Sequence, residues 1–360
     1  MESRCMQIFQ SSCKTKATYK TFLNFLDTFL DWSKYDYDSL LELDITKLED
    51  KLVDYVMYLK RRVSDGELSP NSIPDIMVAI FKFLKCNRKK IDRDLIIEHY
   101  PDKIKMGGDR AITDDEIRQL LDFSDKRDTA IIHMVSATGA RPEALSELKM
   151  KDVEKLEDGF TKLILYADDF KHETITFLHA EASHALNEYL AWRKRKGDKI
   201  TDQSYLFSTI SKESKNPSSR LNIGNMQCTM HRLFQSAGII RIKKGKRYDL
   251  ATFTGFRKRF STRLELNSAI SQSLIQCLMD HTGYLSRNYR KPTEEELLME
   301  YKKGVNSLMI SNEWKLKQEL EESKKENIAE KDKRIEDLES ALKKQELMLS
   351  QLMKKIEYSS

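Results

Sequence analysis

The chain has 360 residues, of which 40% are hydrophobic and 33% carry a charge. This length allows two domains of ordinary size, and 15 Phe, 14 Tyr and 3 Trp exclude a chain that is disordered throughout. With 62 Lys and Arg against 57 Asp and Glu, the net charge of +5 is too small to establish a nucleic-acid partner by itself.

Five widely spaced cysteines, none in a C-x-x-C pair, argue against a disulfide framework and against a zinc site. No apolar stretch approaches the roughly 20 residues of a membrane span, and the first residues, MESRCMQIFQSS, lack the apolar core of a signal peptide. We therefore expect a soluble, cytoplasmic protein that does not contact a membrane.

The first hundred residues predict helices. Apolar residues recur at helical spacing between Phe22 and Leu30, and Thr46 with Glu49 predicts a capping box at the start of a later helix. We assign residues 1–101 to a helical domain. Residues 102–112 contain basic residues and a Gly pair, a composition typical of a linker, so the domain boundary is expected near residue 108.

The next 200 residues predict a mainly helical domain, residues 113–310. Thr113 and Glu116 form a capping box, and further helices are expected near 128–136, 181–196, 222–237, 256–266 and 269–280. Two β-rich runs, 162–166 and 173–178, flank a polar turn and predict a hairpin. The predicted fold class is thus mainly α with one small β-hairpin.

The last fifty residues, 311–360, carry a heptad repeat. Apolar residues spaced by seven, with further leucines three residues after two of them, form an a/d seam at Ile328, Ile335, Leu338, Leu342, Leu349, Leu352 and Ile356. This pattern predicts a coiled coil. Polar residues at two d positions, Lys331 and Gln345, leave open a single amphipathic helix folded back on the rest of the chain.

Several residues suited to phosphate chemistry occur in a fixed order. Arg141 follows a Thr-Gly-Ala turn at the start of a helix, and Lys171 lies in the hairpin turn. Arg257 follows in a Thr-Gly-Phe-Arg segment, His281 in Met-Asp-His, and Tyr289 comes eight residues after that histidine.

This ordered set resembles the tyrosine recombinase, or phage integrase, family, and especially its archaeal members. The resemblance covers roughly residues 20–310 and is strongest in 135–150 and 252–305. It implies a two-domain clamp around double-stranded DNA, with a helical core-binding domain and a catalytic domain. The implied activity is site-specific recombination, as in integration or excision of a mobile element, by four protomers on two synapsed duplexes.

The resemblance also implies a role for each motif residue. Tyr289 would attack phosphorus and form a 3′-phosphotyrosyl bond, while Arg141 and Arg257 bind the non-bridging oxygens with forked guanidinium groups. Lys171 would protonate the leaving 5′-oxygen, and His281 would donate a hydrogen bond to phosphate or assist proton transfer. The reaction needs no metal or other cofactor.

Two departures from the family pattern keep alternatives open. The family usually has His three residues before the second Arg, whereas this chain has Thr254 before Arg257. A hydroxyl donates to phosphate but is no base near neutral pH, which favours a rival: a catalytically weakened or inactive DNA-binding relative. In the hairpin, Ala-Asp-Asp-Phe precedes Lys171 where a Gly-Lys is common, so Lys162 remains a competitor.

Two other tyrosines compete with Tyr289 for the role of nucleophile. Tyr284 lies three residues after His281, and we expect it to pack in the turn. Tyr301 lies in a later Leu-Leu-x-x-Tyr pattern that is typical of a core position.

DNA contacts outside the catalytic site are expected to be mainly electrostatic. Basic groups such as the pair Lys258 and Arg259 are candidates for contact with phosphate, the alternative being an ordinary solvated face. The candidate DNA-binding residues are Lys103, Lys105, Lys243, Lys244, Lys246, Arg247 and Lys258. The heptad repeat adds a further expectation, dimerisation through the tail.

Overall fold

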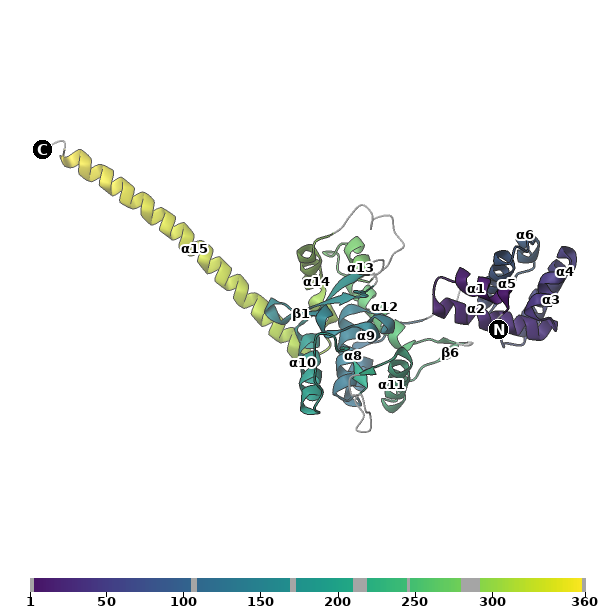
Figure 1. Cartoon of the computed structure of the whole chain (residues 1–360). Coiled ribbons are helices and arrows are strands. Elements are labelled where there is room, and N and C mark those ends of the chain that lie inside the picture. Colours follow the sequence, from purple (N-terminus) through teal and green to yellow (C-terminus); the bar gives the residue numbers. More distant parts are fainter. Residues whose placement is uncertain are drawn as a thin grey trace. The chain divides into compact units, whose positions relative to one another are not determined.

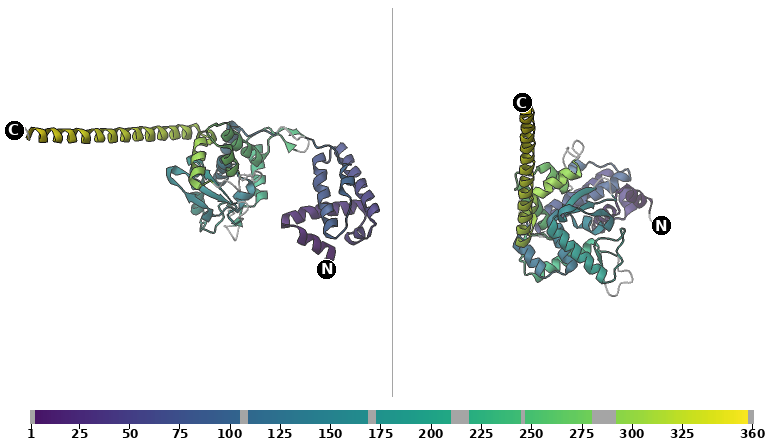
Figure 2. Two further views of the ribbon diagram at one scale, coloured as in Figure 1. Left: turned by 90° about the horizontal axis from the view of Figure 1, so that it is seen from above. Right: turned by 90° about the vertical axis from the view of Figure 1, so that its left-hand side faces the viewer.

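The computed structural model describes residues 3–104, 109–168, 173–209, 219–244, 247–279 and 292–357. The chain forms two compact units (Figures 1 and 2): unit 1 is Met1–Gly108 with Lys243–Arg247, and unit 2 is Asp109–Ile242 with Tyr248–Ser360. Among the described residues, no helix combines the length and the apolar character that crossing a membrane requires.

Unit 1 is built from helices around an aromatic core. They are α1 (Arg4–Ser12), α2 (Lys16–Ser33), α3 (Tyr37–Glu42), α4 (Ile45–Ser64), the 3₁₀ turn η1 (Pro70–Ser72), α5 (Ile73–Cys86) and α6 (Arg93–Ile97). Phe9, Phe29 and Phe83 are fully buried, and the rings of Phe9 and Phe83 meet edge to face. The predicted helical character of this segment is confirmed.

The start of α4 corrects one sequence prediction. The side chain of Asp44 accepts the N–H of Thr46, so Asp44 is the N-cap and Thr46 lies inside the helix. The predicted capping box of Thr46 and Glu49 is therefore wrong. An aspartate two residues earlier can satisfy the same N–H groups, and its negative charge also suits the positive end of the helix dipole.

Unit 2 contains most of the secondary structure. Its helices are α7 (Asp114–Asp122), α8 (Lys126–Thr138), α9 (Pro142–Glu147), α10 (Ala180–Arg195), α11 (Ile223–Ser236), α12 (Thr252–Glu265), α13 (Gln272–Leu278), α14 (Glu294–Leu308) and α15 (Asn312–Glu357), with 3₁₀ turns η2 (Met150–Asp152) and η3 (Glu157–Gly159). The capping box at the start of α7 is confirmed, because Thr113 and Glu116 each accept the other's backbone N–H.

The predicted hairpin is the centre of a small antiparallel sheet. Strands β1 (Val153–Lys155), β2 (Thr161–Leu165) and β3 (Thr174–Leu178) pair in that order, with Leu163 opposite Thr176. Four two-residue strands were not predicted: β4 (Ser208–Thr209) pairs with β5 (Ser219–Arg220), and β6 (Lys243–Lys244) with β7 (Arg247–Tyr248). The sheet and the helices confirm a mainly α fold.

Helix α8 is the centre of the unit 2 core. Buried residues cover all sides of it from Ala130 to Thr138, as expected for a helix enclosed by others. Helices α10 and α12 pack against it. A second apolar cluster, with Phe177, Leu264 and Tyr301, joins the sheet to α12, α13 and α14. Tyr301 of the second cluster donates a hydrogen bond to the carbonyl of Ala137 in the first, close to the end of α8 and the turn before Arg141.

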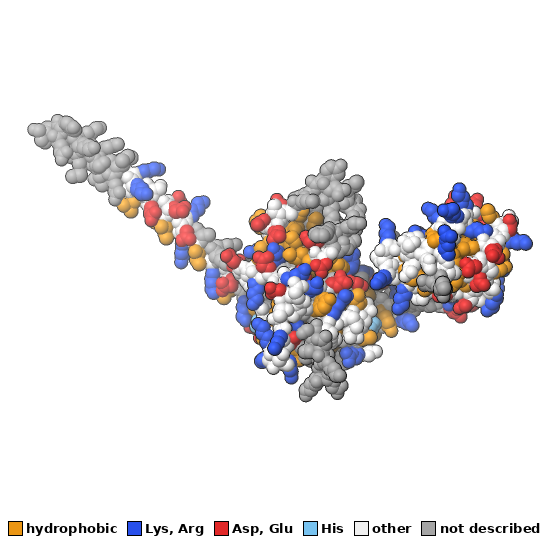
Figure 3. All heavy atoms as spheres, in the orientation of Figure 1, with side chains coloured by type: hydrophobic (Ala, Val, Ile, Leu, Met, Phe, Trp, Pro, Cys, Tyr) orange, Lys and Arg blue, Asp and Glu red, His pale blue; other side chains and the backbone are white. Residues whose placement is uncertain are grey.

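The long helix α15 is attached to unit 2 at its first turn. Both carboxylate oxygens of Glu181 accept backbone N–H groups, from Ile310 at 2.8 Å and Ser311 at 2.9 Å. The ring of Trp314 lies 5.5 Å from that of His184. Farther along the helix the described side chains are exposed, and Figure 3 shows hydrophobic side chains on its surface among basic and acidic ones.

Candidate functional site

The predicted turn around Arg141 connects α8 to α9. Gly139 has a left-handed conformation, with φ of 61°, and its N–H donates to the carbonyl of Val135 at 2.9 Å. The hydroxyl of Thr138 accepts the N–H of Ala140 at 3.1 Å. Arg141 is then the N-cap residue of α9, and its side chain is exposed. The expected position of this arginine at a helix start is confirmed.

The side chain of Arg257 connects two of the other motif segments. One guanidinium nitrogen, Nη1, donates to the carbonyl of Gly139 at 2.7 Å, and Nη2 donates to the carbonyl of Met279. Gly139 lies two residues before Arg141, and Met279 lies two residues before His281. Three motif segments that are far apart in the sequence therefore meet at one guanidinium group.

Thr254 lies one turn before Arg257 in the same helix. Helix α12 begins at Thr252, a few residues earlier than the sequence predicted, so both residues belong to its first two turns. Residues three apart in a helix share a face. Thr254 is exposed and Arg257 is half-buried, which places a hydroxyl next to the second arginine on the accessible side of α12.

Tyr301 occupies the core, as its pattern predicted. It is fully buried, and its hydroxyl donates to the carbonyl of Ala137 at 2.9 Å. Burial raises the pKa of Tyr301 far above the ordinary tyrosine value. A hydroxyl that is buried, already donating and hard to ionise is poorly suited to attack phosphorus.

Lys162, the rival for the hairpin lysine, is held in a structural ion-pair network. Its ammonium nitrogen lies 2.6 Å from a carboxylate oxygen of Glu154 and 2.7 Å from one of Glu294. The hydrogen bond to Glu154 and then that to Glu294 raise the pKa of Lys162. This lysine ties the sheet to the start of α14, and its side chain is only 11% exposed.

The first part of the hairpin turn, up to Asp168, is held by two lysines. Asp168 accepts hydrogen bonds from Lys149 at 3.0 Å and from Lys151 at 3.1 Å. These two bonds lower the pKa of the Asp168 carboxyl group. Lys171, the predicted catalytic lysine, lies three residues later and outside the described residues.

Several predicted site residues lie outside the described ranges: Lys105, Lys171, Lys246, His281, Tyr284 and Tyr289. The structure describes the chain before and after the segment that contains His281, Tyr284 and Tyr289. It reaches Met279, which is bonded to Arg257, and resumes before α14, whose start is capped by Thr293 and Glu296.

The described candidates for DNA contact differ in their surroundings. Lys103, Lys243 and Arg247 are exposed, and Lys244 lies in β6. Lys258 is half-buried and donates to the backbone carbonyl of Asp109 at 2.8 Å.

Arg259 corrects the expectation that the pair with Lys258 contacts phosphate. Its residue surface is only 2% exposed, and its guanidinium group donates to Asp114 at 2.8 Å and to the carbonyl of Leu308 at 3.0 Å. Burial tends to raise the pKa of Asp114, but the charge and hydrogen bond of Arg259 outweigh this, and the pKa is lowered. Phe256 and Phe260, three residues before and one after, marked this side of α12 as the core side.

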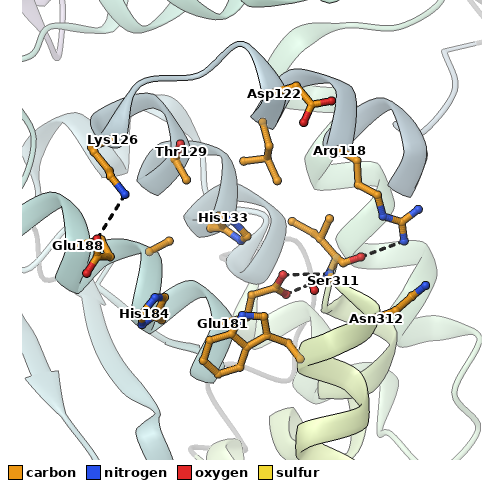
Figure 4. Close-up of a pocket in the computed structure, with 14 residues that line it drawn as sticks. Arg118, Asp122, Lys126, Thr129, His133, Glu181, His184, Glu188, Ser311 and Asn312 are labelled. Atoms are coloured by element: carbon orange, nitrogen blue, oxygen red, sulfur yellow. Dashed lines mark hydrogen bonds and ion pairs between the residues drawn. The ribbon is translucent and has the colours of Figure 1, made fainter.

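A pocket of about 540 Å³ lies at the attachment of α15 (Figure 4). Helices α7, α8 and α10 line it, with His133, Glu181 and His184 among the lining side chains. Burial, together with the charge of His184, lowers the pKa of His133 to about 4. The residues that line this pocket include none of the described catalytic candidates, so the pocket is separate from the site around Arg141 and Arg257.

Comparison with known proteins identifies the family of the chain. The sequence matches the phage integrase family over residues 110–295, just over half of the chain. The matched region contains all six candidate catalytic residues. A comparison with curated protein sequences finds no match.

Solved structures share the fold at low sequence identity. A lambda integrase(75-356) dimer bound to a COC′ core site has a TM-score of 0.52 and 15% identity, covering 81% of this chain and 96% of that one. A lambda integrase tetramer bound to a Holliday junction has a TM-score of 0.51 and 16% identity, and the match covers 78% of this chain and 77% of that one. The Tn1549 transposon integrase in complex with transposon right end DNA has a TM-score of 0.51 and 15% identity, and the match covers 83% of this chain and 98% of that one.

A mainly helical fold with a small antiparallel sheet, together with this family match, is consistent with the catalytic fold of the tyrosine recombinases. The chain belongs to the phage integrase family.

Proposed function

We propose that this protein is a site-specific DNA recombinase that cuts and rejoins strands through a covalent 3′-phosphotyrosyl intermediate. The proposal rests on family membership and on the bonds that Arg257 makes to the backbone beside Arg141 and shortly before His281. Among the described contacts, this convergence is the observation that carries the proposal, because it holds Arg257 beside the segments that contain Arg141 and His281.

The chemistry is a pair of transesterifications. The hydroxyl of Tyr289 loses its proton, with His281 assisting the transfer, and its oxygen bonds to phosphorus. The bond from phosphorus to the 5′-oxygen breaks, leaving a free 5′-hydroxyl. Lys171 gives its proton to that leaving oxygen. Arg141 and Arg257 stabilise the charge on the non-bridging oxygens, and His281 donates a further hydrogen bond. Attack by a 5′-hydroxyl from another strand reverses the step and releases the tyrosine.

The wider assembly is part of the same proposal. Residues 1–101 act as the core-binding domain and 113–310 as the catalytic domain, joined by the linker 102–112, so that the two domains grip double-stranded DNA. Exposed Lys103, Lys243 and Arg247 contact phosphates. Four copies act on two synapsed duplexes, in support of which a related fold is solved as a tetramer bound to a Holliday junction. We place the protein among archaeal-type integrases that insert or excise a mobile element.

The test is a covalent trapping assay. The protein is incubated with a pool of nicked duplexes that have a randomised central segment, and complexes that resist denaturant are isolated. We expect an adduct that Tyr289→Phe abolishes. An adduct that survives Tyr289→Phe would move the nucleophile to Tyr284, since Tyr301 is buried. If wild-type protein binds the pool but forms no adduct, the recombinase proposal is wrong.

Two lysine variants form a matched pair in the same assay. Lys171→Ala removes the proposed proton donor, and we expect adduct formation to slow about 100-fold. Lys162→Ala removes a lysine that bridges Glu154 and Glu294, and we expect a change of less than about threefold. The reverse result would assign the proton donor to Lys162.

A second candidate function is favoured by Thr254. A family member that keeps the DNA clamp but has lost efficient cleavage would bind DNA and form little adduct. Thr254→His restores the usual family residue on the exposed side of α12. A large increase in adduct formation by this variant would favour the weakened relative, whereas an unchanged rate in a wild-type protein that readily forms the adduct would favour a fully active enzyme.

A further inference from the structure

Helix α15 presents an apolar stripe that the rest of unit 2 leaves open. Its apolar side chains keep more than half of their surface exposed, at 58% for Ile328, 53% for Ile335, 61% for Leu338 and 57% for Leu342. The first turn, in contrast, is held by Glu181 and packed by Trp314. The exposed stripe therefore projects from a helix whose base is fixed, and it does not fold back on the unit.

The spacing of this stripe fits a two-stranded coiled coil. Ile328, Ile335 and Leu342 occupy a positions, and Leu338 occupies a d position between them. In the sequence the repeat continues through Leu349, Leu352 and Ile356. Ile stands at three of the five a positions and Leu at two of the four d positions, and Ile at a with Leu at d is the combination that favours two strands over three or four.

We propose that α15 pairs with α15 of a second copy of this chain as a parallel, in-register coiled coil. The charges beside the seam determine the direction. Three of the four e positions are acidic, at Asp332, Glu339 and Glu346, and the fourth is Met353. The g positions 327, 334, 341, 348 and 355 hold Asn, Arg, Ala, Met and Lys, none of them acidic. Parallel pairing places e against g, and antiparallel pairing places e against e, which brings the acidic groups together.

One ion pair and one amide pair fix the register. In register, Arg334 faces the partner's Glu339, and the two-fold symmetry forms this pair twice. Gln345 at a d position faces the partner's Gln345, and two amides can donate and accept across the axis. Lys331 also meets its own copy, and its long stem lets the ammonium group reach water.

This inference extends the proposed function and does not depend on it. About 16 residues of helix separate Asn312 from the start of the repeat, or roughly 24 Å at 1.5 Å per residue. Two catalytic units are thus held within roughly 50 Å of each other before DNA is present. Such tethering raises the effective concentration of the second unit to the millimolar range. The protein would then bind DNA as a preformed pair.

The first test measures the mass of the full chain without DNA by analytical ultracentrifugation across a range of concentrations. We expect a monomer–dimer equilibrium. Arg334→Glu turns two attractive pairs per dimer into repulsive ones, and we expect the dissociation constant to rise about tenfold. Lys333→Glu makes the same charge change at the neighbouring, outward-facing f position. We expect this variant to change the dissociation constant less than about twofold. Adding Glu339→Arg to Arg334→Glu restores the pair and the affinity.

The second test determines strand direction by disulfide trapping. Exposed Cys228 is first replaced by serine, and Lys331→Cys and Leu352→Cys are then made separately in that background. In a parallel, in-register pair each new cysteine meets its own copy, and both variants cross-link under mild oxidation. The background chain, which keeps its other four cysteines, is the control and is expected to stay uncross-linked.

Each alternative result overturns a stated part of the inference. Cross-linking of only one of the two cysteine variants would indicate antiparallel or shifted pairing, and a trimer or tetramer would exclude two strands. A chain that is monomeric at all concentrations, or equal effects of Arg334→Glu and Lys333→Glu, would refute the pairing. If the protein is monomeric and still forms the Tyr289 adduct, the coiled-coil pairing is wrong and the proposed recombinase function stands.

Discussion

Replacing Gly139 with alanine tests how closely the turn before Arg141 is fitted to the rest of the site. Gly139 has φ of +61°, and a Cβ atom built there would lie 2.9 Å from Cδ1, 3.0 Å from Cγ and 3.1 Å from Cβ of Phe260. Phe260 is fully buried in α12, three residues after Arg257. Its Cβ is fixed to the helix backbone, so relief of the clash requires α8 and α12 to move apart.

The expected magnitude has two parts. A left-handed conformation costs a residue with a Cβ atom about 1 kcal/mol. Forcing a methyl group into a filled core costs about 2 kcal/mol more. Gly238 provides a matched control, because it has nearly the same φ, +65°, but no atom within 4 Å of the added Cβ. Gly139→Ala should therefore lower the free energy of unfolding by about 3 kcal/mol, and Gly238→Ala by about 1 kcal/mol.

The assay is urea denaturation of both variants followed by circular dichroism, paired with the covalent trapping assay. Movement of α12 shifts Arg257 away from the carbonyl of Gly139, so we expect Gly139→Ala to reduce adduct formation more than about 100-fold even where the protein is folded. Gly238→Ala should leave it unchanged. Equal losses of stability in the two variants would refute the steric argument.

Three further predictions concern buried polar groups. Burial lowers the pKa of His133 to about 4 and of His179 to about 3, so the unfolded chain binds more protons below pH 6.5. The free energy of unfolding should thus fall by about 2 kcal/mol from pH 6 to pH 5, measured by urea denaturation, and His179→Asn should reduce this dependence. Tyr301→Phe should cost about 1 kcal/mol of stability and leave the adduct intact; loss of the adduct in a folded protein would contradict a purely structural role. Arg259→Met leaves Asp114 without its main partner and should cost about 3 kcal/mol in the same denaturation assay, whereas a cost below about 1 kcal/mol would refute its structural role.

The sequence predicted the elements whose signals are local and repeated. Helical spacing and the capping box of Thr113 identified α7, and the β-rich residues of 162–166 and 173–178 around a polar turn identified the hairpin. The box at Thr46 failed because Asp44 competes for the same N–H groups, and two caps within one turn look alike in a sequence. Strands of two or three residues, such as β4 and β6, are too short to show alternation.

The candidate site was predicted as a set of residue types but not as a set of contacts. The order of the motif residues carried the prediction, while the bonds from Arg257 to two backbone carbonyls left no mark in the sequence, because every residue has a carbonyl. Arg259 was misread because an arginine beside a lysine suggests a charged surface. Its partner Asp114 lies 145 residues away, beyond the reach of a local pattern.

The end of α8 has a consequence for the order of events during synthesis. Its last carbonyls accept from Arg257, 118 residues farther along the chain, and from Tyr301, 164 residues beyond Ala137. Bonds over such separations form late in folding, because the intervening chain must first be ordered. During synthesis, Arg141 emerges from the ribosome well before α14 does. Until α14 has also emerged, the growing chain lacks a completed site. Under the proposed function, the protein should become able to break DNA only when nearly all of its folded part has been made.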